Sequence, residues 1–218
     1  DKQIFSCYHK VYMDATNAIF YILVLVMSVV IHEISHGFMA EYFGDKTARF
    51  AGRLTLNPIK HLDLFGSILL PGLLLITGSP FLFGWAKPVP YNPYNLSNKK
   101  WGTIAVASAG VIANFAIAII FGLILRFSLN MNVPAGFDFI ISSIVVVNLG
   151  LAIFNLIPIP PLDGSKIFLN LLPVSFMRIV NFFENYSLVL IIIFIVFFSN
   201  YLYPILTFLF HAITGRFI

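Results

Sequence analysis

Long apolar runs dominate the pattern of hydrophobic and polar positions along this chain. Four stretches without any Asp, Glu, Lys or Arg cover 64–86, 103–125, 139–162 and 185–215, and a further apolar run covers 15–31. Each of the four reaches the roughly 20 residues that a membrane-spanning helix needs. The pattern predicts an all-α polytopic membrane protein, a bundle of about five to six transmembrane or re-entrant segments with short membrane-associated strands or loops.

The stretch 64–86 is the one whose crossing the pattern leaves open. Prolines and glycines within it interrupt a helix. Basic residues flank it on both sides, in 41–63 and in 87–101, and the positive-inside rule places such segments in the cytoplasm. Both flanks cannot lie on one side if the stretch crosses once. Either it is re-entrant, or one basic segment lies outside.

Composition confirms the class of protein. Hydrophobic residues make up 59% of the chain and charged residues 10%, whereas about 25% charged residues is typical of soluble domains. The net charge of +4 fits contact with anionic lipid of the bilayer, and no basic and aromatic pattern suggests nucleic acid. The single cysteine, Cys7, excludes an internal disulfide and a cysteine zinc cluster. With no repeat and no signal-peptide cleavage site evident, we expect one integral-membrane domain over 1–218.

Polar residues interrupt the first apolar run in "VVIHEISHGF", residues 29–38. On a helix, His32 and His36 lie on one face and Glu33 lies about 100° further round. H-E-x-x-H is a zinc pattern in which two histidines bind the metal and the glutamate acts as a base. An ionisable group inside a membrane costs roughly 2.5 to 3.5 kcal/mol, which favours a functional reading. The alternative is that the three side chains satisfy one another in a bundle core.

Asp163 is the predicted third ligand, because a catalytic zinc site needs three protein ligands and an open position. It follows "FNLIPIPPL", where Pro158, Pro160 and Pro161 end a helix. Irregular backbone at membrane depth is tolerated where it is buried in protein or lines a watery cavity, so this break indicates a site. The alternative is that Asp163 caps a short helix over 164–172.

These residues resemble the site-2 proteases, a family of intramembrane zinc metalloproteases. The resemblance has two separated parts, H-E-x-x-H at 32–36 and N-x-x-P-x-P-x-x-D-G at 155–164. The stretches "GDKTARFAGRLTLNPIKHLDLFGS", "FGWAKPVPYNP" and "ASAGVIANF" are similar to the short bacterial branch without an added sensor domain. The resemblance implies a location in the bacterial inner membrane, and membrane-anchored regulators or leftover signal peptides as substrates.

The resemblance also implies a role for each motif residue. His32, His36 and Asp163 would hold one zinc ion per chain, Glu33 would be the catalytic base, and Asn155 would position or stabilise the reacting carbonyl. The chain has Gly110-Val111 where members often have Gly-Pro, and Asp163-Gly164-Ser165 where many have Asp-Gly-Gly. Neither departure removes a ligand, and both concern local backbone shape and substrate preference.

Asparagines in the apolar helices are further candidates. Asn155 is seven residues after Asn148, so both amides share a helix face, and one of them would supply a donor to the oxyanion. The alternative is hydrogen bonding between helices. We favour a catalytic role for Asn155, and packing for Asn148 and Asn114.

Two segments are predicted to bind substrate. A scissile bond inside a helix must be unwound, and pairing of the extended substrate with a strand would replace its lost hydrogen bonds. "GRLTL", 52–56, fits a short strand, and "WAKPVPY", 85–91, fits an edge strand or an extended arm. The alternative is that both are interfacial loops, with Trp85, Tyr91 and Trp101 as headgroup anchors.

The predicted function is hydrolysis of peptide bonds in or near transmembrane segments by a zinc-dependent endopeptidase. The polar stretch after His36 lies about two turns from the site, which would therefore open toward the cytoplasm. Gly37 and Gly164, beside ligands, would leave room for close backbone approach. A metal-ion or proton transporter is the rival reading, but the run 15–31 offers no polar path. A third reading is an inactive relative that acts as a binding partner of membrane proteins. The complete motifs argue against this reading.

Overall fold

The computed structural model describes residues 15–69, 73, 76, 86–128, 133, 134 and 136–217, and helices are the regular elements of this part of the chain. Capping residues set several of the boundaries. Asn98 accepts a hydrogen bond from the Trp101 N–H at the start of α4, and Gly215, with a φ of 72°, ends α8. The elements are α1 (Ala15–Tyr42), α2 (Thr47–Phe50), η2 (Pro58–His61), η3 (Leu64–Leu69), η4 (Pro93–Asn95), α4 (Lys99–Phe127), α5 (Phe137–Asn155), α6 (Asp163–Leu171), η6 (Val174–Phe176), α7 (Met177–Asn185) and α8 (Ser187–Thr214).

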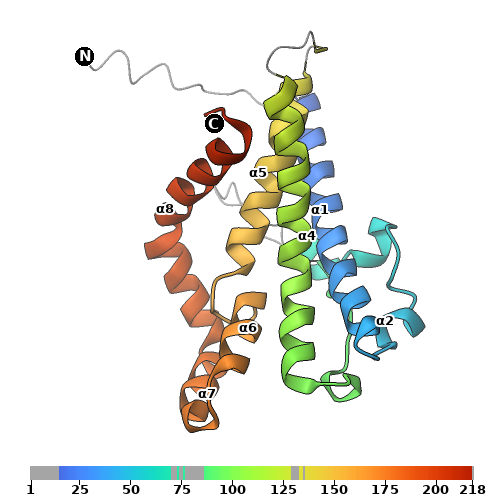
Figure 1. Cartoon of the computed structure of the whole chain (residues 1–218), viewed down its shortest axis with the longest axis vertical. Coiled ribbons are helices and arrows are strands. Elements are labelled where there is room, and N and C mark those ends of the chain that lie inside the picture. Colours follow the sequence, from blue (N-terminus) through green and yellow to red (C-terminus); the bar gives the residue numbers. More distant parts are fainter. Residues whose placement is uncertain are drawn as a thin grey trace.

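Three long helices, α1, α4 and α5, form the centre of the bundle, and α8 packs beside α5 and α4 (Figure 1). Small residues on α4 allow this close packing. A Cβ on Gly122 would lie 2.4 Å from the Ile213 side chain of α8. The buried core between these helices contains Ala118, Leu125, Val145, Leu149 and Phe210, among others.

Within the described part of the chain, three helices are long and apolar enough to cross a membrane: Ile19–Tyr42, Lys99–Phe127 and Phe137–Asn155. A fourth span results if Met177–Asn185 and Ser187–Phe198, bent by 74° at a short break, count as one. The predicted crossings at 15–31, 103–125 and 139–162 fall on the three helices, and 185–215 falls on α8. The crossing predicted for 64–86 lies largely outside the described residues.

The two basic segments lie at the same end of the bundle, the lower end in Figure 1. The Ser97 N–H donates to the Phe43 carbonyl at 2.8 Å, and the Lys87 N–H donates to the His61 carbonyl at 2.9 Å. The chain therefore enters and leaves the stretch 64–86 at one end. This arrangement favours the re-entrant alternative and excludes the one that places a basic segment at the opposite end.

The strand predicted at 52–56 is wrong, and none of the described residues forms a strand. Gly52 has a φ of 62°, and the Thr55 N–H bonds locally to the Arg53 carbonyl at 3.0 Å, so the backbone turns. Residues 86–90 form no regular secondary structure, and Pro88 and Pro90 have no N–H with which to continue a ladder. The side chain of Arg53, instead of the backbone, binds this segment.

Candidate metal centre

The two histidines of α1 and the aspartate at the start of α6 meet in the interior of the bundle. His32, His36 and Asp163 are 6%, 8% and 5% exposed. Each pair of facing atoms is 3.0 Å apart: His32 Nε2 and His36 Nε2, His32 Nε2 and Asp163 Oδ2, and His36 Nε2 and Asp163 Oδ2. The sequence placed these residues 131 positions apart, from 32 to 163, and the fold brings them together.

The other ring nitrogen of each histidine has an oxygen partner. His36 Nδ1 lies 2.6 Å from the Val106 carbonyl, and His32 Nδ1 lies 2.8 Å from Asn114 Oδ1. A carbonyl oxygen only accepts, so each neutral imidazole carries its proton on Nδ1 and presents Nε2 as an acceptor. The Asn114 amide nitrogen donates to Asn148 Oδ1 at 3.1 Å, which fixes the Asn114 oxygen toward His32.

Three acceptor atoms therefore converge on one point, an arrangement that a cation satisfies. Tetrahedral zinc with bonds of roughly 2.0 to 2.1 Å holds its ligand atoms about 3.3 Å apart, close to the 3.0 Å separations found here. The donor set of two imidazoles and one carboxylate is also that of catalytic zinc sites, which leave the fourth position open. The residues present fit zinc.

Asp163 reaches the centre through the break between α5 and α6. The helix α5 ends at Asn155, and the proline-rich stretch after it turns the chain back. A Cβ on Gly164 would lie 2.2 Å from the Leu156 carbonyl oxygen, so the close approach expected at this glycine is present. Leu162 occupies the N-cap position of α6, and the Asp163 carboxylate faces the imidazoles instead of capping the helix.

Lys166, one turn further along α6, balances the charge of Asp163. Its Nζ lies 3.2 Å from Asp163 Oδ1. Burial by itself would lower the pKa of Lys166, but the nearby Asp163 carboxylate outweighs it and raises that pKa. Burial by itself would raise the pKa of Asp163, and the Lys166 ammonium group is one of the neighbours that lower it. Both groups are charged at neutral pH.

Glu33 lies beside the converging atoms and is not one of them. Its Oε2 accepts a hydrogen bond from the Val89 N–H at 2.8 Å. The backbone of residues 86–90, which follow the stretch 64–86, therefore holds Oε2 of Glu33. The other carboxylate oxygen, Oε1, is left for other partners. Gly37, one turn after Glu33, packs tightly as expected, since a Cβ there would lie 2.9 Å from Val89 Cγ1.

Asn114 hydrogen-bonds between helices, as expected, and one of its two partners is the candidate ligand His32. A Cβ on Gly110, four residues earlier on α4, would lie 2.6 Å from the His32 ring, so this helix face is shaped around the imidazole. The spacing of Gly110 and Asn114 on one face was the available signal. Asn148 packs between helices as expected, donating to Ser28 Oγ at 2.9 Å.

Asn155 does not contact the metal ligands. Its amide nitrogen donates to the Leu151 carbonyl of its own helix at 2.9 Å, and the side chain is half-buried. One N–H of the Asn155 amide is thus bonded within its own helix, and the role expected of Asn155 would fall to its second N–H or follow release of the Leu151 carbonyl.

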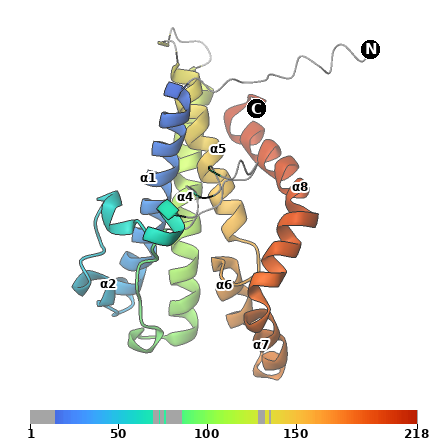
Figure 2. The same cartoon turned by 180° about the vertical axis from the view of Figure 1, so that it is seen from behind.

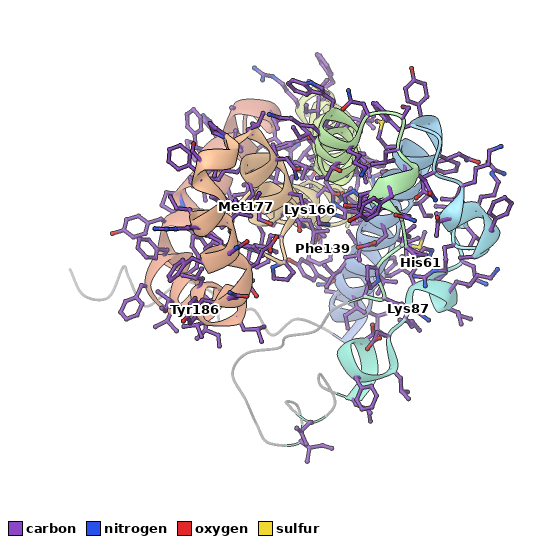
Figure 3. The ribbon with its side chains drawn as sticks, turned by 90° about the horizontal axis from the view of Figure 1, so that it is seen from below. His61, Lys87, Phe139, Lys166, Met177 and Tyr186 are labelled. Carbon is purple, nitrogen blue, oxygen red and sulfur yellow. The ribbon has the colours of Figure 1, made fainter. Side chains whose placement is uncertain are left out.

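A cleft of about 730 Å³ lies next to the centre. One side is formed by the segment 86–90 and the other by helices α6 and α7. Its walls include Pro88, Lys100, Pro161, Ser165, Lys166 and Glu184. Figure 3 looks onto this end of the molecule, with Lys166 and Met177 near the middle of the view, and Figure 2 shows α6 and α7 below α5. The cleft borders the centre at Lys166, whose Nζ contacts Asp163 Oδ1.

Comparison with known proteins decides the family. The model of peptidase family M50 matches residues 20–139 and 130–199. The chain belongs to peptidase family M50, the site-2 protease family. This M50 protein is an intramembrane zinc metalloprotease with His32, His36 and Asp163 as its candidate metal site.

Two relatives indicate how far the similarity of the M50 protein extends. It is 38% identical over 193 residues to "Putative zinc metalloprotease YwhC" of Bacillus subtilis, covering 85% of this chain and 84% of the relative. It is 32% identical over 141 residues to "Putative zinc metalloprotease Rip2" of Mycolicibacterium smegmatis, covering 64% and 52%. No solved structure is significantly similar to it.

Proposed function

We propose that this M50 peptidase cuts peptide bonds in or near the transmembrane helices of other membrane proteins, with His32, His36 and Asp163 holding zinc and Glu33 as the base. The observation that carries the proposal is the convergence of three acceptor atoms 3.0 Å apart beside a glutamate that is not among them. Hydrolysis needs a metal and a separate base, and this arrangement supplies a place for both.

Glu33 performs the proton transfers. Zinc, when bound, supplies a Lewis acid that lowers the pKa of water from 15.7 to about 7. As the water oxygen bonds to the carbonyl carbon, the Glu33 carboxylate accepts the water proton, and it then donates that proton to the amide nitrogen as the C–N bond breaks. The Val89 N–H holds Oε2 of Glu33, which leaves Oε1 for this work.

The developing oxyanion requires a hydrogen-bond donor of the chain besides the metal. We assign this role to Asn155, whose amide becomes available when it releases the Leu151 carbonyl. The ammonium group of Lys166 lines the cleft and keeps the Asp163 carboxylate charged and oriented. A typical donor in this role contributes about 2.7 to 4 kcal/mol to transition-state stabilisation.

The substrates are membrane-anchored proteins whose scissile helix unwinds on entering the site. The cleft beside Lys166 opens at the end of the bundle that carries the basic segments. The positive-inside rule assigns that end to the cytoplasm, and the bacterial relatives suggest the inner membrane as the location. Cleavage would therefore release a product on the cytoplasmic side.

A transport pathway lacks support beyond the centre. Ser28, Asn114 and Asn148 continue the polar groups for about one helical turn from His32. Beyond Ser28, Val24, Val145 and Leu149 are buried between the helices, and the buried Ser143 hydroxyl bonds the Phe139 carbonyl of its own helix. A polar path on both sides of the site, which a conduit requires, is not formed by these residues.

The test is cleavage of a fluorescent single-span reporter in lipid vesicles, with a glycine and a proline in the cytoplasmic half of its helix. The parent should cut the reporter, lose activity to a chelator and regain it with added Zn²⁺. Glu33→Gln should bind the same amount of zinc and leave the reporter intact. Cleavage by Glu33→Gln at the parent rate would refute the assignment of the base.

A further inference from the structure

Residues 86–90, here called the arm, lie against the turn that contains Arg53. Arg53 is 8% exposed. Its Nη2 donates to the Lys87 carbonyl at 2.7 Å and to the Pro88 carbonyl at 3.3 Å. No described group accepts a hydrogen bond from its Nε. The contacts recorded for this buried guanidinium are thus to backbone oxygens of the arm.

The arm's own donors are few, and both of those with partners contact other elements. Pro88 and Pro90 have no N–H. The Lys87 N–H donates to the His61 carbonyl at 2.9 Å, and Figure 3 shows these two residues on neighbouring segments. The Val89 N–H donates to Glu33 Oε2 at 2.8 Å. Arg53 and Glu33 therefore bind adjacent peptide groups of the arm: Arg53 binds the carbonyls of Lys87 and Pro88, and Glu33 binds the N–H of Val89.

Packing fixes the register of the arm. Val89 is 5% exposed and sits directly over Gly37 of α1, where a Cβ would come within 2.9 Å of it. Beyond the arm, the buried carboxylate of Asp45 accepts the Asn92 N–H at 2.6 Å. Val89 lies between Pro88 and Pro90, so a slip of one residue in either direction would place a proline, without an N–H, opposite Glu33.

We propose that Arg53 is a positioning residue for catalysis: by holding the Lys87 and Pro88 carbonyls it places the Val89 N–H against Glu33 and so orients the catalytic base. The proposal rests on the proposed function, because it assumes that Glu33 is the base. In this proposal the side chain of Arg53, and not a strand over 52–56, holds the arm in place. Among the described residues, the side chain of Arg53 bonds Lys87 and Pro88 and not His32, His36 or Asp163, so its loss should leave zinc binding unchanged.

The experiment compares Arg53→Gln with the parent in lipid vesicles. Zinc content should be unchanged, and kcat on the fluorescent reporter should fall about 10- to 100-fold with little change in KM, because a misplaced catalytic group costs rate more than binding. Arg53→Lys, which keeps the charge and one donor direction, should recover part of the rate. Arg49→Gln is the matched control, since Arg49 pairs with Glu41 on the exposed side of the same region and does not touch the arm.

Amide hydrogen exchange gives a readout that is independent of activity. A peptide over 87–90 contains only the Lys87 and Val89 amide protons, because prolines have none. Its exchange should accelerate in Arg53→Gln toward the level of Glu33→Ala, which removes the acceptor for Val89, and should stay at the parent level in Arg49→Gln. If Arg53→Gln fails to fold, Arg53→Lys serves for both measurements.

Three results would overturn the proposal: parent-like kcat in Arg53→Gln, unchanged exchange over 87–90, or loss of zinc from the folded variant. Failure of the proposed function has a different signature, since the parent itself would then not cleave the reporter or Glu33→Gln would cleave it normally. The exchange result tests the link between Arg53 and Glu33 in either case.

Discussion

His32 Nδ1 lies 2.8 Å from Asn114 Oδ1, and the same asparagine is tied through its nitrogen to Asn148 on α5. The hydrogen bond fixes the His32 tautomer, so that Nε2 faces His36 and Asp163 as an acceptor. Three helices thereby determine the orientation of one imidazole. The consequence is that zinc affinity depends on a residue that is not itself a ligand.

Asn114→Ala should weaken zinc binding by about 10- to 100-fold, the usual effect of losing a partner behind a metal-binding histidine. Competition with a zinc chelator of known affinity measures this. Ser143→Ala is the control, because it removes a buried polar group of α5 that bonds the Phe139 carbonyl of its own helix and lies outside this network. Equal losses in both variants would show that the effect comes from helix packing and not from orientation of the imidazole.

Asn155→Ala should lower kcat by about 10² to 10³, the range for loss of one oxyanion donor, while zinc content stays at the parent value. Reporter cleavage and metal analysis on the same preparation measure both quantities. Ser143→Ala, on the same helix, is the control, since its hydroxyl also bonds the carbonyl one turn earlier, at 2.7 Å. If Asn155→Ala keeps full kcat, the donor to the oxyanion is another group.

Gly164→Ala should disrupt the α5–α6 break, because the added Cβ would meet the Leu156 carbonyl oxygen at 2.2 Å and the backbone must shift. Overpacking of this kind costs typically about 1 to 3 kcal/mol, and Asp163 should lose its position. Thermal unfolding and zinc content are the measurements. Gly150→Ala, whose Cβ would make an ordinary contact at 3.7 Å with Leu206, should keep the parent's zinc content. Full zinc binding in Gly164→Ala would contradict this reading of the break.

Asp45→Asn should destabilise the loops around Asp45 at neutral pH but not at low pH. Burial would raise the pKa of Asp45, but hydrogen bonds from Thr47, Asn95 and Asn92 lower it overall. A lowered folded-state pKa contributes stability above the unfolded pKa of about 3.9, and this contribution disappears as pH falls through the folded value. The gap in unfolding midpoint between parent and variant should therefore shrink below about pH 4. A gap that is constant with pH would contradict the role of the charge.

The sequence predicted the long helices and the candidate metal ligands because both have local signals. Apolar length marks α1, α4, α5 and α8, and the i, i+4 spacing of His32 and His36 determines that they share a face. Prolines correctly indicated the break that delivers Asp163. These features depend on neighbours in sequence, so one chain is enough to read them.

The features that were missed depend on partners far away in sequence. "GRLTL" alternates like a strand, but Arg53 binds the arm with its side chain, and nothing within 52–56 indicates that choice. An asparagine in an apolar helix has many possible partners, so Asn114 did not reveal its bond to His32, 82 residues away. The residues that would show whether 64–86 dips into the membrane lie largely outside the described part of the chain. The segments that flank this stretch meet at one end of the bundle.

Zinc per chain in the purified parent, Asp163→Ala and Glu33→Gln is the most direct test of the three-ligand site. The parent and Glu33→Gln should each hold one zinc ion, because Glu33 is not a ligand, and Asp163→Ala should lose it at equal chelator concentration. If Asp163→Ala retains zinc as tightly as the parent, the third ligand lies elsewhere. In that case the convergence of His32, His36 and Asp163 does not describe the metal centre.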